Sequence, residues 1–122
     1  MNINKLTKLA LIPYLIVLIT VSVIPLGNMS KQIMDVHVIK LRGDYFLHML
    51  VYLPLITLIF LRFQKFKWRM LFFALGMAVG LEYVQKLLPY RSFNINDLIA
   101  NVAGVILGMV VMLIIRRFVK KD

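Results

Sequence analysis

The chain has 122 residues, of which 61% are hydrophobic and 16% are charged, and its mean hydropathy is +0.87. A soluble globular domain is about 45–50% apolar and about 25% charged, and a small one needs an even larger polar share. The composition therefore excludes an ordinary soluble domain, and it excludes a disordered chain, which is poor in apolar residues. It indicates a membrane protein with one domain over residues 1–122.

Lysine and arginine together number 15 against 5 acidic residues, which gives a formal net charge of +10. On a soluble domain this excess would suggest a nucleic-acid partner. Here most basic residues lie between apolar runs, where membrane topology explains them, so we expect no nucleic-acid binding. The absence of cysteine excludes disulfides, thiol nucleophiles and cysteine-ligated zinc.

The chain contains four apolar runs that are long enough for transmembrane helices, which need about 20 residues each. They cover residues 9–26, 45–61, 70–88 and 98–115. The first run lacks the cleavage pattern of a signal peptide, so we expect it to remain in the protein. The prediction is an all-α membrane protein, a compact bundle of four transmembrane helices surrounded by the lipid bilayer.

The loop over residues 27–44 has no single predicted conformation. Met34, Val38 and Leu41 suit one face of a helix, whereas Val36 and Val38 alternate as in a strand.

Basic residues are shared unequally between the two sides of the predicted bundle. Five lie in or beside the first and third loops. Ten lie in or beside the two termini and the second loop. The ten are Lys5, Lys8, Arg62, Lys65, Lys67, Arg69, Arg116, Arg117, Lys120 and Lys121. Because basic residues concentrate on the cytoplasmic side, we expect both termini in the cytoplasm and the first and third loops outside.

Polar residues gather at the outward ends of three predicted spans. Within each span they are three or four residues apart, which places them on one helix face. In chain order these residues and the arginine of the third loop are Asp44, His48, Tyr52, Glu82, Gln85, Arg91, Asp97 and Asn101. Polar groups in a bilayer are costly and normally face the bundle interior or a wet cavity. The pattern therefore predicts one outward-facing polar site.

Some of these residues have structural alternatives. Asp44 and Asp97 could cap the helices that they begin. Glu82 lies near a helix C-terminus, where the helix dipole disfavours an anion, so it needs a partner. Arg91 and His48 are the natural candidates, and we expect Glu82 and Arg91 to form an ion pair or to share a ligand.

Small residues form two stripes at helical spacing. Gly76 and Gly80 lie on the third span, and Ala100, Gly104 and Gly108 lie on the fourth. Such stripes let helix backbones approach closely in lipid. They predict close packing within the bundle or, alternatively, a homodimer through Gly76/Gly80 or Gly104/Gly108.

The ordered polar motifs resemble the VanZ-like family of bacterial membrane proteins, named for a protein that confers teicoplanin resistance. The resemblance covers residues 43–108, and it differs from the commoner family pattern at Tyr45 and Met49. The motifs are Asp44-x3-His48-x3-Tyr52, Glu82-x2-Gln85, Arg91 and Asn96-Asp97-x3-Asn101-x2-Gly104-x3-Gly108. The resemblance implies a multi-pass protein of the bacterial cytoplasmic membrane.

The predicted site suits an amphipathic cell-envelope molecule, such as a lipid-linked precursor or a lipoglycopeptide, that is bound or processed there. Asp44, His48 and Glu82 are the candidate acid–base residues. The candidate binding residues are Tyr52, Gln85, Arg91, Asp97 and Asn101. Asp44, His48, Glu82 and Asp97 also offer metal-ligand atoms, but the sequence assigns no metal or cofactor.

Two other functions remain open from the sequence. In one, the protein is a non-catalytic structural or interaction protein whose polar network only locks the helices together. In the other, acidic and histidine side chains relay protons or small ions. The relay is disfavoured because the inner halves of the spans show almost no polar residues to complete a route.

The expected orientation can be tested with single cysteines, because the chain has none of its own. In intact cells, a membrane-impermeant maleimide should label Arg42→Cys and should not label Lys65→Cys. Labelling at position 65 alone would reverse the orientation and place the polar site on the cytoplasmic side.

Overall fold

The computed structural model describes residues 3–24, 37–38, 41–63, 68–91 and 93–119. Each of the four predicted spans is present as a helix that is long and apolar enough to cross a membrane. The helices are α1 (Ile3–Val23), α3 (Gly43–Phe63), α4 (Trp68–Leu87) and α5 (Ile95–Val119). The prediction of a four-span, all-α, multi-pass membrane protein is therefore confirmed. The cytoplasmic placement of the termini stays a prediction.

All four helices begin before the apolar runs. Helices α3 and α5 also end beyond them, whereas α1 and α4 end at Val23 and Leu87, before their runs do. The largest difference is at α1, which begins at Ile3 and so includes Lys5 and Lys8. Lysine is a good helix former, and its aliphatic stem can follow the apolar surface while its charge reaches water. An apolar run therefore indicates the part of a helix that lies in the bilayer core, and the helix itself can begin before that part.

A short hairpin precedes α3. Strand β1 (His37–Val38) pairs antiparallel with β2 (Leu41–Arg42), with His37 opposite Arg42 and Val38 opposite Leu41. Of the two conformations that the sequence left open, Val38 thus adopts the strand. Met34 and Val36 lie outside the described residues.

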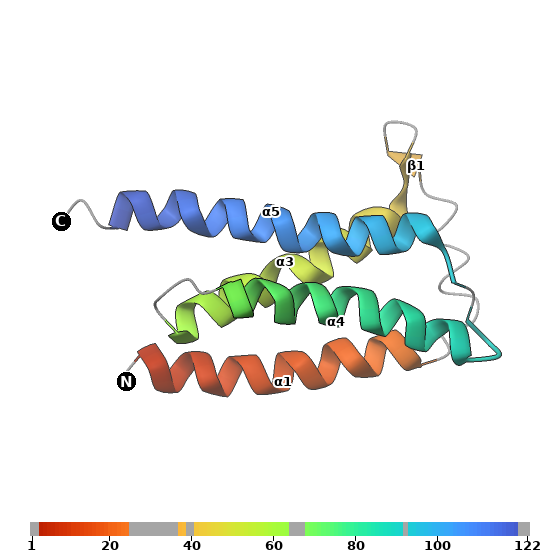
Figure 1. The fold of residues 1–122 in the computed structure, drawn as a ribbon, viewed down its shortest axis with the longest axis horizontal. Helices are drawn as coiled ribbons and strands as arrows, with labels where there is room; N and C mark the ends of the chain where they lie inside the picture. The colour runs from red at the N-terminus through yellow and green to blue at the C-terminus, as the bar shows by residue number, and fades with distance from the viewer. Residues whose placement is uncertain (1–2, 25–36, 39–40, 64–67, 92, 120–122) are drawn as a thin grey trace.

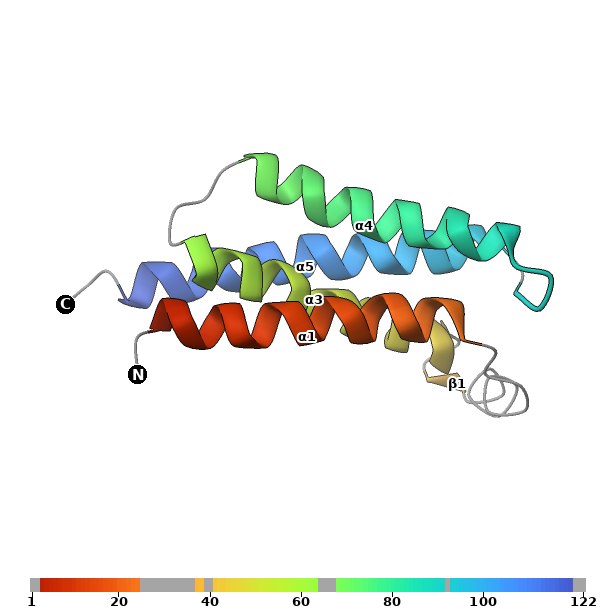
Figure 2. The same ribbon diagram turned by 90° about the horizontal axis from the view of Figure 1, so that it is seen from below.

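The four helices run lengthwise, and the first residues of α1 lie at the same end of the bundle as the last residues of α5 (Figure 1). Helix α3 crosses the others and packs most extensively on α5, with further contacts to α1 and α4 (Figure 2). We call the end where α1 and α4 finish and α3 and α5 begin the loop end. The opposite end, where α1 begins and α5 finishes, is the terminal end.

Apolar residues fill the interior and also cover the outside. Leu55, Ile56 and Val105 are fully buried between the helices. Large apolar side chains such as Phe72 and Ile99 are exposed on the outer faces, as expected of helices that meet lipid on one side and one another on the other.

The small-residue stripe of α5 packs against α3. A Cβ atom at Gly104 would overlap the backbone carbonyl of Met49, and one at Gly108 would lie 2.6 Å from the carbonyl oxygen of Leu53. The predicted close packing within the bundle is confirmed here, and this stripe is not open to a second copy of the chain. Gly76 and Gly80 have open space beside them, so a dimer through these two residues stays a prediction.

The tight contact between α3 and α5 predicts opposite effects of the same substitution at two glycines. Gly104→Ala should lower the free energy of unfolding by about 1–3 kcal/mol, the usual cost of overpacking. Gly76→Ala, the matched control, adds its methyl group to open space and should leave the stability unchanged or slightly higher. Thermal unfolding in detergent, followed by circular dichroism, measures both variants. Equal losses would contradict the assigned packing.

Candidate functional site

Asn101 of α5 is the centre of a polar network at the loop end. Its side-chain nitrogen donates to Glu82 Oε2 at 3.2 Å and to the carbonyl oxygen of Ala78 at 3.5 Å, both on α4. Its side-chain oxygen lies 2.8 Å from Nδ1 of His48 on α3. Because the amide nitrogen faces two acceptors, the amide oxygen must face the histidine, and Nδ1 of His48 is the donor. One buried amide therefore joins three helices.

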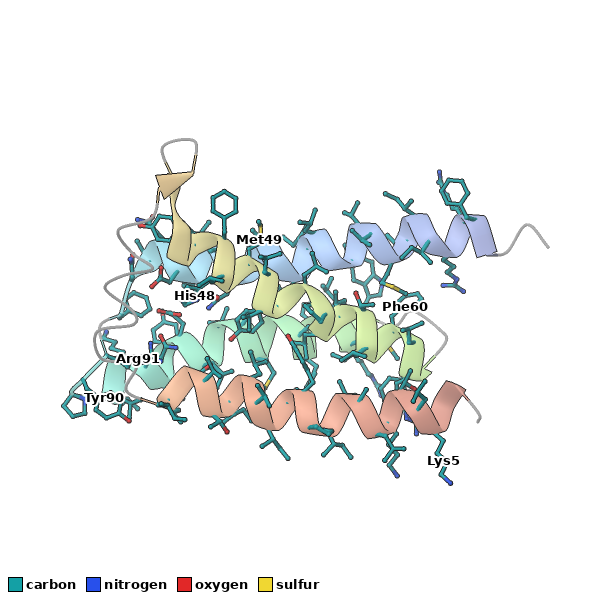
Figure 3. The ribbon with its side chains drawn as sticks, turned by 180° about the vertical axis from the view of Figure 1, so that it is seen from behind. Lys5, His48, Met49, Phe60, Tyr90 and Arg91 are labelled. Carbon is teal, nitrogen blue, oxygen red and sulfur yellow. The ribbon has the colours of Figure 1, made fainter. Side chains whose placement is uncertain are left out.

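His48 connects this network to the surface. Its second ring nitrogen, Nε2, lies 3.6 Å from Oδ2 of Asp97, which is beyond hydrogen-bond length but within ion-pair distance. The side chains of His48 and Asp97 are 24% and 14% exposed, whereas Asn101 and Glu82 are buried. Figure 3 places His48 at the loop end, far from Lys5 and Phe60 at the terminal end.

Glu82 is fully buried on α4. One carboxylate oxygen accepts the hydrogen bond from Asn101, and the other, Oε1, has no hydrogen-bond partner among the described residues. The backbone N–H of Asn94 also faces this carboxylate, but it does not complete a hydrogen bond to Oε1. The direct partner of Glu82 is thus a neutral amide and not a cation.

Arg91 is used elsewhere, and the expected ion pair between Glu82 and Arg91 is not formed. One guanidinium nitrogen of Arg91 donates to the carbonyl oxygens of Val21 at 2.8 Å and Ile24 at 2.9 Å. The neighbouring Tyr90 hydroxyl donates to the carbonyl of Val23 at 2.6 Å. The last carbonyls of a helix lack intrahelical partners, and the loop between α4 and α5 supplies them for α1 (Figure 3).

Asn94 caps the start of α5. Its side-chain oxygen accepts from the backbone N–H of Asn96 at 3.0 Å, and its carbonyl accepts from the N–H groups of Asp97 and Leu98. The alternative in which Asp97 itself is the cap residue is therefore wrong. Asp97 lies in the first turn of α5, where the helix dipole favours an anion, and its side chain faces His48.

The structure thus joins four of the eight predicted site residues in one hydrogen-bonded and ionic network: His48, Glu82, Asp97 and Asn101. We call these four residues the polar network. Tyr52 and Gln85 are buried on the expected helix faces, but no hydrogen bond among the described residues joins them to it. Arg91 supports α1, and the side chain of Asp44 lies outside the described residues.

Sequence reasoning missed two contributors at the loop end. Asn94 escaped notice because a loop residue before a span has no helical periodicity, although asparagine three residues before the acidic Asp97 is a recognisable capping signal. Ser22 of α1 is buried and hydrogen bonds to Tyr52. A single hydroxyl within an apolar run gives little sequence signal.

The polar network has the groups needed for proton exchange with a bound molecule. Nε2 of His48 lies 3.6 Å from Oδ2 of Asp97, and both side chains are partly exposed. Among the described residues, no three His, Asp or Glu side chains gather as a metal site would require. Two surface grooves lie instead at the terminal end, beside Lys5 on α1 and Arg116 on α5.

A four-helix membrane bundle with a polar network at one end is the class of protein that these observations define. The family model described as VanZ/LLP1 matches residues 4–116. The match covers most of the chain, and the protein therefore belongs to the VanZ/LLP1 family. The comparisons with curated proteins and with solved structures gave no match.

Glu82 pairs with Asn101 and not with Arg91, and this predicts which residues are energetically coupled. In a double-mutant cycle, Glu82→Ala and Asn101→Ala should show a coupling energy of about 0.5–3 kcal/mol, as residues in one network do. The matched cycle of Glu82→Ala with Arg91→Ala should be additive within about 0.5 kcal/mol. Denaturant unfolding in mixed micelles measures both cycles. Coupling in the second cycle alone would restore the ion pair that we exclude.

Proposed function

We propose that this protein binds the polar head of an amphipathic cell-envelope molecule, a lipid-linked precursor or a lipoglycopeptide, at the loop end of its bundle. The loop end then faces outward from the bacterial cytoplasmic membrane, in agreement with the distribution of basic residues. His48 exchanges a proton with the bound head group, and Asp97 and Asn101 orient the ring. The resemblance to the VanZ-like family supports a role in teicoplanin-type resistance as part of this proposal.

The observation that carries this proposal is the graded exposure of the polar network. Asn101 and Glu82 are buried and hold the network in place, whereas His48 and Asp97 reach the surface. Polar groups held at the edge of a bilayer by a buried scaffold are typical of functional sites in membrane proteins. A network that served only to join helices would not need its histidine at the surface.

The surroundings of the polar network suit an amphipathic ligand. Leu47 and Leu50, which flank His48 on α3, are exposed, and so is Ile99 between Asp97 and Asn101 on α5. A lipid tail can lie along these side chains while the head group meets His48 and Asp97. The hydrophobic contact then supplies affinity, and the few polar groups supply orientation.

The proposal predicts loss of binding without loss of fold in surface variants of the polar network. His48→Ala and Asp97→Asn should each weaken binding of a lipoglycopeptide to the protein in lipid nanodiscs by about tenfold or more, equivalent to about 1.4 kcal/mol. Thr57→Val is the matched control on α3, because the Thr57 hydroxyl bonds only locally, to the carbonyl of Leu53. It should bind as the unaltered protein does.

A glycopeptide without an acyl chain serves as the ligand control in the same titration, and it should bind weakly to every variant. Susceptibility of a bacterial host that expresses each variant provides the second measurement. Equal binding by the unaltered protein, His48→Ala and Asp97→Asn would contradict the proposal.

A structural role is the second candidate, and the complete burial of Glu82 and the near-complete burial of Asn101 favour it. In that role, His48→Ala should reduce the amount of folded protein in the membrane as strongly as Asn101→Leu does. In the binding role, Asn101→Leu destabilises the protein, whereas His48→Ala leaves its amount near normal and removes only binding. Quantification of folded protein by size-exclusion chromatography separates the two.

A further inference from the structure

Three hydroxyl side chains lie along the inward face of α1. Thr7, Tyr14 and Ser22 are spaced by seven and eight residues, close to two helical turns each time. Thr7 and Ser22 are buried, and the Tyr14 hydroxyl is buried although its ring is partly exposed. The sequence shows almost no polar residues in the inner halves of the spans, but α1 packs two polar side chains against the bundle there, Tyr14 within the first span and Thr7 just before it.

Tyr52 of α3 links this row of hydroxyls to the polar network. It is buried, it hydrogen bonds to Ser22, and it lies close enough to both Tyr14 and Glu82 to interact with each electrostatically. The chain of neighbours therefore runs from His48 and Asn101 to Glu82, then to Tyr52, and on to Tyr14 in the middle of α1.

Two oxygen atoms of residues that interact with Tyr52 are buried without a hydrogen-bond partner among the described residues. They are Oε1 of Glu82 and the hydroxyl oxygen of Tyr14. Nearly all buried polar atoms in proteins have a partner, either protein or ordered water, and a buried water typically bridges two to four such groups. Water molecules between Glu82, Tyr52 and Tyr14 would satisfy both atoms.

We propose that ordered water molecules occupy the seam between α1, α3 and α4 and complete a proton path that joins the polar network to Thr7 near the terminal end. Along this path each water or hydroxyl oxygen accepts one proton and passes its own to the next oxygen, so that no group changes its composition. Glu82 accepts the proton at the loop end, and water exchanges it with the ring of His48, while Asn101 holds both side chains in place and takes up no proton itself.

The geometry of α1 supports the remaining step from Tyr14 to Thr7. Seven residues of helix separate them by about 10 Å along the axis. Long side chains in a helix point back towards its N-terminus, so the Tyr14 ring extends towards Thr7 and shortens the gap that water must bridge. Among the described residues, the titratable or charged groups along the route include His48, Asp97, Glu82, Tyr52 and Tyr14, and Lys5 and Lys8 lie at the terminal end.

The proton path is tested by flux into liposomes that contain the purified full-length protein. A potassium gradient with valinomycin drives protons inward, and a trapped pH-sensitive dye reports them. The unaltered protein should conduct above protein-free liposomes, and Tyr14→Phe, which removes one hydroxyl, should reduce the flux to the protein-free level. Thr20→Val is the matched control on α1, since the Thr20 hydroxyl is exposed and bonds to the carbonyl of Ile16.

The proposed path would be overturned if the unaltered protein gave only the protein-free flux. It would also be overturned if Tyr14→Phe conducted as well as the unaltered protein. This assay needs no envelope ligand, so its failure leaves the proposed binding function intact, and failure of ligand binding leaves the path intact.

The melting temperature of Tyr14→Phe tests the water molecules themselves. Removing a dry, unpartnered hydroxyl relieves a desolvation penalty and raises the melting temperature, whereas removing a hydroxyl bonded to buried water lowers it. We expect a lower melting temperature for Tyr14→Phe and an unchanged one for Thr20→Val. A higher melting temperature for Tyr14→Phe would show a dry seam and would overturn the proposal.

Discussion

A polar group within a bilayer has no bulk water to bond with, so the interior of the bundle must supply its partner. Asn101 meets this constraint for three helices at once, because one amide satisfies His48 on α3 and both Glu82 and a backbone carbonyl on α4. A side chain with both donors and an acceptor is needed in this place, since the groups around it are of both kinds. The arrangement of the loop end therefore depends on this one amide.

Packing of small residues sets the geometry of the same network. The backbone of Met49 lies against Gly104. Met49 directly follows His48 in α3, and Gly104 lies about one turn after Asn101 in α5. Because Gly104 permits contact between the two backbones, the side chains one turn away meet at hydrogen-bond distance. The close packing at the glycine stripe and the hydrogen bond between His48 and Asn101 thus depend on the same contact between α3 and α5.

The length of the apolar runs was sufficient to predict the spans. Helical spacing then predicted the convergence of His48, Glu82, Asp97 and Asn101, because spacing determines the helix face and the number of spans determines the end of the bundle. It failed for Arg91, since sequence shows a charge but not which unpaired carbonyls lie nearest in space. It also passed over Ser22, which apolar residues surround in the sequence. Partner choice among buried groups depends on tertiary distances, which one sequence does not contain.

The support of α1 by Tyr90 and Arg91 has a consequence for assembly during synthesis. The donors follow the carbonyl of Val23 by 67 residues or more along the chain. While the ribosome is still making α3 and α4, Tyr90 and Arg91 are not yet present to donate to these carbonyls at the end of α1. Its final position therefore becomes available only after the loop before α5 has emerged, and the first helix to enter the membrane is among the last to be locked in place.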